Sequence, residues 1–132
     1  MTLYLVRGLP GSAKSTYAKQ MNIAHFENDM YFMRNGKYEF DQFKHKDAME
    51  CCAEMTRACL ESGMDVVVSN VFPKRRSMYR YFAMAKIFGA EVKVIRMMNK
   101  FKDVHNVPAN ALKWMKENFE DYDREELVMF KV

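Results

Sequence analysis

The residues with the clearest chemistry form a run near the N-terminus that combines glycines, a lysine and hydroxyl side chains. The run reads Gly8-Leu9-Pro10-Gly11-Ser12-Ala13-Lys14-Ser15-Thr16 and follows the apolar residues 3–6. Glycine-permitted backbone lets several N–H groups converge on phosphate oxygens, while a lysine reaches the β- and γ-phosphates and a hydroxyl binds Mg²⁺. The sequence therefore predicts a phosphate-binding loop for a nucleoside triphosphate, with Lys14 on the phosphates and Ser15 on the metal.

One position departs from the usual pattern G-x-x-x-x-G-K-[ST], because Ala13 stands where a glycine precedes the lysine. A Cβ there can crowd the phosphate or the tight backbone, so we expect a weakened site and not a lost one. The alternative is an ordinary turn between a strand and a helix. Such a turn has no use for Lys14 followed by two hydroxyl residues.

An acidic segment, Phe26-Glu27-Asn28-Asp29-Met30-Tyr31-Phe32, follows the second expected strand. A carboxylate at this strand end would face the γ-phosphate and could accept a proton from an acceptor hydroxyl. Asp29 is the candidate base and Glu27 its competitor. The alternative is that Asp29 only caps the turn.

A third segment, Asp65-Val66-Val67-Val68-Ser69-Asn70, predicts a buried strand whose end lies beside the loop. Most enzymes of this kind place an aspartate there to organise Mg²⁺, but here the residue is Ser69. Asn70 could bind water or phosphate, or it could belong to a polar turn. Ser15 would then be the one protein ligand, which suffices because Mg²⁺ keeps several waters.

Basic residues are concentrated in residues 71–102, where nine stand against the single acid Glu91 in a chain of net charge +4. This imbalance indicates an anionic partner, either nucleotide phosphates or a nucleic acid, or else a solvated helix face. The residues singled out as phosphate or nucleic-acid contacts are Asn70, Lys74, Arg75, Arg76 and Arg96.

Hydrophobic periodicity predicts alternating strands and helices, and therefore an α/β fold with a parallel sheet of four to five strands and helices on both faces. The expected strands are 2–7, 24–27, 65–71 and 91–97, and the expected helices are 14–22, 41–62, 74–88 and 108–122. The loop 31–40 is a candidate mobile flap. Residues 120–132 are expected to dock on the chain's own core, with an edge strand or a subunit contact as further possibilities.

At 132 residues with 49% hydrophobic content, the chain is long enough for one domain, 1–132, and too short for two. No apolar run reaches the roughly 18 residues that span a bilayer, so a soluble, cytoplasmic protein without a membrane partner is expected. Cys51, Cys52 and Cys59 are expected to be reduced core thiols. The sequence leaves the oligomeric state open.

Four ordered motifs resemble those of the polynucleotide-kinase-like P-loop ATPases, a family that includes the kinase domain of phage polynucleotide kinase and the NEDD4-binding-protein-type P-loop domains. They are the loop 8–16, Asn28-Asp29-Met30-Tyr31-Phe32, Val67-Val68-Ser69-Asn70 and His105-Asn106-Val107-Pro108. The resemblance spans roughly residues 3–120. It implies ATP-dependent phosphoryl transfer to a hydroxyl, such as the 5′-hydroxyl of a nucleic acid, with ATP and Mg²⁺ as cofactors.

By this resemblance Lys14 stabilises the transferring phosphate, Ser15 binds Mg²⁺ and Asp29 is the general base. Lys102 takes the place of the family's lid arginine, for which Arg96 or Lys100 could compensate, and the lid between 97 and 108 is shorter than usual. The departures at Ala13, Ser69 and Lys102 touch phosphate binding, metal organisation and transition-state charge. Two hypotheses follow: a small kinase acting on a nucleic-acid end, nucleotide or nucleoside, and a nucleotide-binding module with little or no catalysis that acts through a partner.

Overall fold

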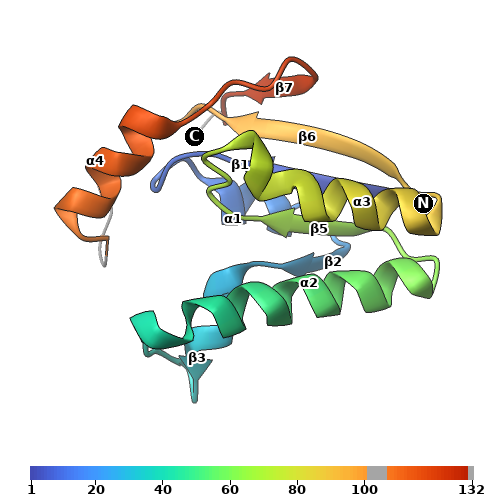
Figure 1. Cartoon of the computed structure of the whole chain (residues 1–132), viewed down its shortest axis with the longest axis horizontal. Helices are drawn as coiled ribbons and strands as arrows, with labels where there is room; N and C mark the ends of the chain where they lie inside the picture. Colours follow the sequence, from blue (N-terminus) through green and yellow to red (C-terminus); the bar gives the residue numbers. More distant parts are fainter. Residues whose placement is uncertain (101–106, 131–132) are drawn as a thin grey trace.

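The computed structural model describes residues 1–100 and 107–130, and its centre is a five-stranded sheet in the order β2-β5-β1-β6-β7 (Figure 1). All neighbouring strands of this sheet run parallel. The strands are β1 (Thr2–Arg7), β2 (Ala24–Phe26), β5 (Val66–Ser69), β6 (Glu91–Met97) and β7 (Glu125–Val128). The α/β class and the parallel sheet expected from the sequence are confirmed.

The central strands are apolar because they are covered on both faces. All four residues of β5 are buried, which explains its unbroken valine run. In β1, Val6 pairs with Ser69 on one side and with Ile95 on the other. The carboxyl ends of three adjacent strands therefore meet where the glycine-rich loop begins.

Helices cover both faces of the sheet, as the alternating pattern predicted. They are α1 (Lys14–Lys19), α2 (His45–Glu61), α3 (Tyr79–Phe88) and α4 (Ala109–Asn118). One core joins Leu3 and Leu5 to residues of α2 and α3, and the other joins Val6 and Val67 to Ala18 of α1. Residues two apart in a strand share a face, so this division follows from the period of the strands. None of the residues of α4 is buried, and it lies on the side toward which β6 points (Figure 1).

Several helix boundaries differ from the prediction. Helix α1 ends at Lys19 and not at residue 22, since Asn22 adopts a left-handed backbone with φ 54°. The expected helices 41–62 and 74–88 each begin with a short 3-10 turn, η2 (Gln42–Lys44) and η3 (Arg75–Met78), before α2 and α3 start. Asp41 caps η2, because its carboxylate accepts from the Phe43 N–H at 3.0 Å.

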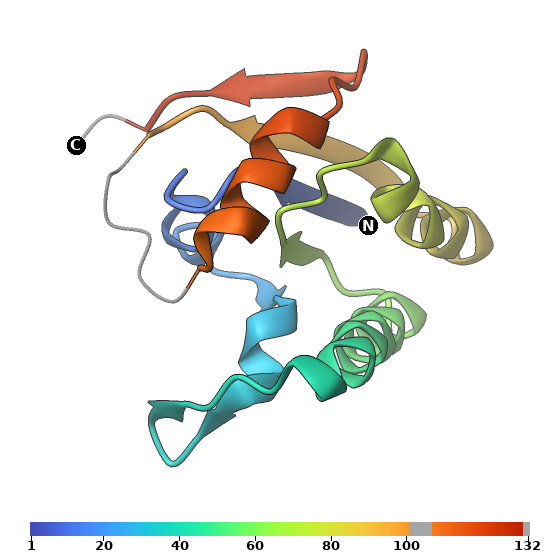
Figure 2. The same ribbon diagram turned by 60° about the vertical axis from the view of Figure 1, so that its left-hand side comes forward.

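The segment expected to be a flap contributes to a 3-10 turn and forms a small hairpin. The turn η1 (Asn28–Phe32) leads into β3 (Met33–Arg34), which pairs antiparallel with β4 (Lys37–Tyr38). Asn35 and Gly36 connect these strands with φ 50° and 76°, which is the pair of left-handed residues that tight hairpins favour. In Figure 2 this hairpin projects away from the main sheet.

The C-terminal segment docks on the chain's own sheet as the edge strand β7. It pairs in parallel with β6, with Val94 opposite Glu125 and Met97 opposite Val128. Both the expected docking and the edge-strand possibility are therefore realised in the same element. The expected helix 108–122 is correspondingly shorter and ends at Asn118.

The cysteines do not form disulfides, but they are not all in the core. Cys52 is buried and Cys59 is half-buried, whereas Cys51 is exposed because it lies on the opposite side of α2. The prediction of three core thiols was wrong for Cys51. Across residues 1–100 and 107–130, no helix has both the length and the apolar character needed to span a membrane.

Candidate functional site

The glycine-rich loop leaves the carboxyl end of β1 and requires glycine at its first position for lack of space. A Cβ on Gly8 would collide with Ser12 Oγ and would lie 3.0 Å from the Met97 carbonyl oxygen. Ser12 is only 1% exposed, and its hydroxyl has no hydrogen-bond partner among the described residues. A buried hydroxyl without a partner is costly, so the loop has the character of a site that a polar ligand completes.

Ala13 occupies a backbone conformation that normally selects glycine, with φ 70° and ψ 27°. The loop thus keeps the backbone shape that the pattern's glycine would give, and the backbone of Ala13 is strained because alanine has a Cβ. A non-glycine residue in this region costs on the order of 1–3 kcal/mol. The Ala13 carbonyl accepts from the Tyr17 N–H at 3.0 Å, so the strained residue is also the start of α1.

Lys14 is folded back over the loop, where its Nζ donates to the Leu9 carbonyl oxygen at 3.1 Å. Burial lowers the pKa of Lys14 to about 8, although the charges of Glu27 and Asp29 act in the opposite direction. A desolvated ammonium gains strongly from an anion brought next to it. The Lys14 ammonium would therefore be stabilised by a phosphate oxygen bound beside it.

Glu27 joins the loop to the strands beside it. Its Oε2 accepts from Ser15 Oγ at 2.6 Å and from Ser69 Oγ at 2.8 Å. Glu27 directly follows β2, Ser15 lies at the start of α1, and Ser69 ends β5, which is the neighbour of β2 in the sheet. The hydroxyl predicted to bind the metal therefore already contacts a carboxylate.

His25 extends this group of side chains. Its Nε2 lies 2.7 Å from Ser69 Oγ and 3.6 Å from Glu27 Oε2. Burial lowers the pKa of His25, while the charge of Glu27 raises it in part. The neutral imidazole is the form that burial favours.

Asp29 lies in η1, two residues beyond Glu27. Burial, followed by the neighbouring charge of Glu27, raises the pKa of the Asp29 carboxyl, while Tyr38 and Lys14 act against this shift. The Tyr38 hydroxyl donates to Asp29 Oδ1 at 3.3 Å. A carboxylate with a raised pKa accepts a proton more readily, which suits the predicted base.

Asn70, predicted as a phosphate contact, is bound to the turn that carries Asp29. Its Oδ1 accepts from the Asn28 N–H at 2.9 Å, and its Nδ2 donates to the Asn28 Oδ1 at 3.2 Å. The side chain therefore holds η1 against the end of β5. Its position links two of the predicted segments.

The predicted cationic contacts fall into two groups. Lys74 Nζ and Arg75 Nε lie 4.0 Å and 3.7 Å from Glu120, and Arg76 is exposed beside them. Arg96 belongs to a separate cluster, in which its Nη1 contacts Asp121 and Glu125 and its guanidinium lies 4.5 Å from the centre of the Phe119 ring. Lys102 and the motif residues His105 and Asn106 lie outside the described residues.

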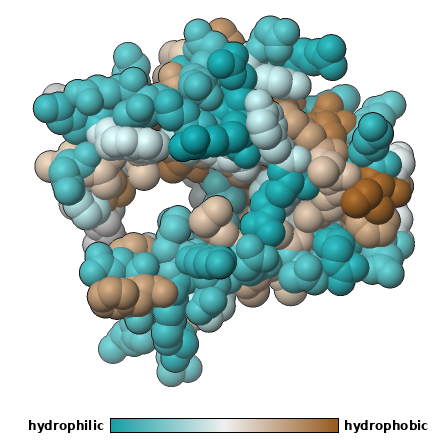
Figure 3. Space-filling model, in the orientation of Figure 1, coloured by the Kyte–Doolittle hydropathy of each residue, from teal (hydrophilic) through white to brown (hydrophobic). Residues whose placement is uncertain are grey.

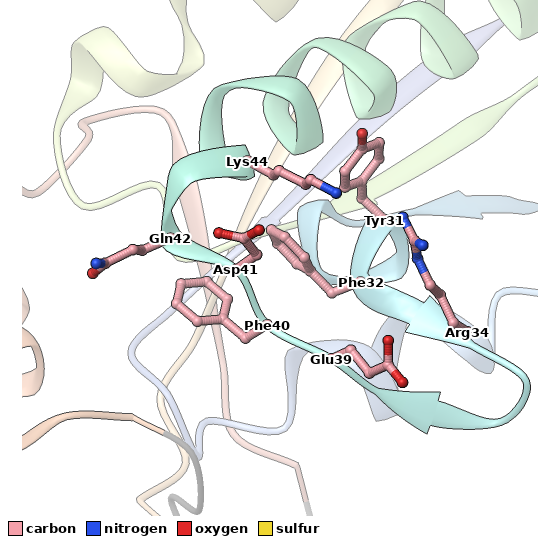
Figure 4. A pocket seen from close by; sticks show the side chains of 8 residues that line it. All are labelled: Tyr31, Phe32, Arg34, Glu39, Phe40, Asp41, Gln42 and Lys44. Atoms are coloured by element: carbon pink, nitrogen blue, oxygen red, sulfur yellow. The ribbon is translucent and has the colours of Figure 1, made fainter.

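A pocket of about 480 Å³ is lined by residues of η1, the hairpin and η2 (Figure 4). Its lining combines aromatic rings with charges of both signs, and no residue of the loop 8–16 contributes. The lining residues are Tyr31, Phe32, Arg34, Glu39, Phe40, Asp41, Gln42 and Lys44. In the orientation of Figure 1, the surface is also hollowed between the position of α4 and that of the hairpin (Figure 3).

Sequence reasoning missed three features of this region: the two hydrogen bonds of Glu27, the contact of His25 with Ser69, and a buried ion pair behind the loop. In that pair, Arg7 Nη1 lies 2.7 Å from Glu125 Oε1. A signal existed for the first two features, because His25 and Glu27 are two residues apart in an extended segment and therefore share a side. No local signal relates Arg7 to a residue 118 positions away.

Comparisons with known proteins bear on the family and the fold of this chain. A family model described as "AAA domain" matches residues 3–122. An uncharacterised protein of Pasteurella multocida (strain Pm70) is 28% identical, with 84% of this chain and 72% of the relative covered.

Two solved structures show the same fold. A sugar kinase from Janibacter sp. HTCC2649 has a TM-score of 0.65 at 14% identity, covering 98% of this chain and 84% of that chain. A chain of the Pnkp1/Rnl/Hen1 RNA repair complex has a TM-score of 0.72 at 16% identity, and 94% of this chain covers 47% of that longer one. The matched family model and the parallel sheet behind a glycine-rich loop together place this chain in the AAA domain family, with the fold of the P-loop kinases.

Proposed function

We propose that this protein is an ATP-dependent kinase of the polynucleotide-kinase-like type, which transfers a phosphoryl group to a hydroxyl of a nucleic-acid end, a nucleotide or a nucleoside. The observation that carries the proposal is the meeting of Lys14, Ser15 and Asp29 at the carboxyl ends of β1 and β2. The charges of Glu27 and Asp29 both act on Lys14, so the cation and the carboxylates share one site.

The loop fits a triphosphate for three reasons. Ser12 has a buried hydroxyl without a hydrogen-bond partner among the described residues, and Lys14 has a desolvated ammonium. Gly8 has no Cβ, which would otherwise collide with Ser12. Converging backbone N–H groups and a helix start favour an anion at the same place. The residues that would contact ATP are those of the loop, Gly8, Gly11, Ser12, Ala13, Lys14, Ser15 and Thr16.

The hydroxyl of Ser15 beside the carboxylate of Glu27 is a donor set of the kind that Mg²⁺ prefers. When bound, Mg²⁺ would neutralise charge on the phosphate oxygens. Among the described residues, Ser15 is the side chain of the loop that a metal would meet.

Asp29 takes the proton of the acceptor hydroxyl as that oxygen bonds to the γ-phosphorus and the bond from phosphorus to the ADP oxygen breaks. Its raised pKa brings the carboxyl closer to the operating pH than an exposed aspartate. Lys14 balances the negative charge on the transferring group, and Lys102 is proposed to add a second cation.

An acceptor that carries a base is supported by the aromatic residues next to Asp29. The Tyr38 and Phe40 rings are stacked at 16° with centroids 6.4 Å apart, and Tyr38 reaches Asp29 through its hydroxyl. Nucleobases stack on such rings without strong sequence preference. Lys74, Arg75 and Arg76 would then contact the phosphates of a longer acceptor, with Asn70 and Arg96 as further candidates.

A second candidate function is a nucleotide-binding module without catalysis. The observation that favours it is Ala13, whose methyl group occupies the loop at the position where the pattern has glycine. In that case nucleotide binding would persist and phosphoryl transfer would be absent.

Transfer of labelled γ-phosphate from ATP separates the two candidates. The acceptors are a 5′-hydroxyl oligonucleotide, a nucleoside, a nucleotide and a simple sugar, each tested with the wild type, Asp29→Asn and the exposed control Asp123→Asn. The proposal expects labelled product from a base-bearing acceptor, lost in Asp29→Asn and kept in Asp123→Asn. Nucleotide binding without labelled product from any acceptor would support the module instead.

A further inference from the structure

A single carboxylate oxygen holds together two hydroxyls of the candidate ATP site. Glu27 Oε2 accepts from Ser15 at 2.6 Å and from Ser69 at 2.8 Å. Both distances are typical of strong hydrogen bonds to a charged acceptor. The hydroxyl that begins α1 and the hydroxyl that ends β5 therefore point toward the same atom.

Ser69 lies where an acidic residue at the end of the buried strand would be expected to organise the metal. A serine hydroxyl cannot replace a carboxylate as a charged ligand, and Ser69 is only 2% exposed. Its neighbour in the sheet is β2, whose last residue, Phe26, pairs with Val68. Glu27, the next residue along, brings its carboxylate to Ser69 from the adjacent strand.

The hydrogen-bond count at Ser69 fixes the direction of the contacts. Its one proton goes to Glu27, so toward His25 Nε2, 2.7 Å away, the oxygen acts as the acceptor. His25 then carries a proton on Nε2 and donates it to Ser69. A chain of donors from His25 through Ser69 therefore ends on the carboxylate of Glu27.

This chain gives Glu27 a fixed position beside Ser15. A glutamate has three rotatable side-chain bonds, and holding it in one place costs conformational entropy. Two hydroxyl donors, one of them itself oriented by a histidine, supply that restraint. The arrangement resembles the way in which outer-shell groups orient ligands in metal sites.

We propose that Glu27, positioned by Ser69 and His25, supplies from β2 the Mg²⁺-organising carboxylate that is missing at the end of β5. This inference rests on the proposed function, because it concerns the metal that accompanies ATP at the same loop. It assigns separate roles to the two acidic residues of the segment: Glu27 organises the metal and Asp29 takes the proton. Ser69 and His25 are positioning residues in this assignment.

The test measures how strongly Mg²⁺ and ATP favour each other's binding. ATP affinity is measured by calorimetry with saturating Mg²⁺ and with EDTA, and the ratio of the two dissociation constants is the metal coupling. Binding of Mn²⁺ in the presence of ATP, followed by electron paramagnetic resonance, gives a second readout that does not depend on activity. Glu27→Gln is the main variant, and Glu126→Gln, at an exposed position, is its matched control.

We expect Glu27→Gln to reduce the metal coupling by at least about tenfold, while ATP affinity in EDTA is unchanged or tighter, because a negative charge near the phosphates is removed. Ser69→Ala should reduce the coupling by a smaller factor. The double variant Glu27→Gln/Ser69→Asp moves the carboxylate back to the end of β5 and should restore the coupling. Glu126→Gln should behave as the wild type.

The double variant also guards against a loss of folding, since a Glu27→Gln chain that is merely damaged would not be rescued by a second charged substitution at a buried position. Wild-type coupling in a folded Glu27→Gln protein overturns this inference and leaves the kinase proposal standing. Absence of ATP binding in the wild type, with and without metal, overturns both. Restored coupling in the double variant supports the assignment.

Discussion

The guanidinium of Arg7 and the carboxylate of Glu125 form an ion pair of 2.7 Å in which the two side chains are 0% and 5% exposed. Arg7 is the last residue of β1, directly before the loop, and Glu125 begins the edge strand β7. The Arg7 guanidinium also donates to the Phe72 carbonyl oxygen at 2.7 Å and lies 4.3 Å from the centre of the Phe119 ring. The pair thus connects the C-terminal segment to the base of the candidate ATP site.

Removal of the Glu125 charge should be strongly destabilising, because it leaves Arg7 buried without its counter-ion. Glu125→Gln is expected to lower the free energy of unfolding by about 3 kcal/mol, measured by urea denaturation. The neighbouring Glu126→Gln is the control, since Glu126 is exposed. Equal stability of the two variants would contradict a structural role for the pair.

Because Ala13 has a left-handed backbone, an alanine-to-glycine substitution should stabilise the protein at this position, whereas it destabilises an ordinary helix. Ala13→Gly should raise the free energy of unfolding by up to about 1 kcal/mol, because glycine adopts φ 70° without strain. The same change at the exposed Ala58 within α2 should lower it by about 1 kcal/mol. Thermal or urea unfolding of both variants checks this, and a destabilised Ala13→Gly protein would show that the loop does not strain the alanine.

The lowered pKa of Lys14 gives ATP binding a pH dependence. Only the protonated amine attracts phosphate, and burial lowers its pKa to about 8 in the free protein. The dissociation constant for ATP should therefore rise as pH increases through this value, by about tenfold between pH 7 and pH 9. Calorimetry over this range with saturating Mg²⁺ measures the effect.

Lys14→Arg is the control for that titration, since a guanidinium stays protonated throughout the range. Its dissociation constant should not change with pH beyond what ATP itself contributes. Equal slopes for the wild type and Lys14→Arg would mean that another group causes the dependence.

Asn70 should affect catalysis and not nucleotide affinity, since it holds the turn that carries Asp29. Asn70→Ala removes both contacts with Asn28, and a displaced base is expected to lower kcat by about tenfold to a hundredfold. The dissociation constant for ATP should stay within about twofold. The control is Asn118→Ala, which removes a side-chain contact within the exposed end of α4. A weakened ATP affinity with unchanged kcat would favour a direct phosphate contact at Asn70.

The fold could be predicted from the sequence because its signals are local, and the candidate site residues were proposed from signals of the same kind. The run 8–16 and the valines of β5 each indicate their structure within a few residues. The contacts of Glu27 and Glu125 could not be predicted in this way, because they depend on which strands become neighbours. Glu27 reaches Ser69 because it directly follows β2, which lies beside β5 in the sheet.

The basic residues show the same limit of sequence reasoning. Net charge along the chain indicated an anionic partner, yet Lys74, Arg75 and Arg96 each lie near an acidic residue of 120–125. These acids are far away in the sequence, so a count over residues 71–102 could not include them. Whether these cations face an anionic partner or acidic residues of the chain itself depends on the tertiary structure.

The measurement that tests the central claim most directly is a calorimetric titration of ATP with Mg²⁺ into the wild type and Lys14→Ala. If the loop binds the phosphates as proposed, the wild type will bind ATP with a stoichiometry of about one, and Lys14→Ala will lose at least about tenfold in affinity because the buried ammonium is gone. Absence of ATP binding in the wild type, or equal affinity in Lys14→Ala, would contradict the claim.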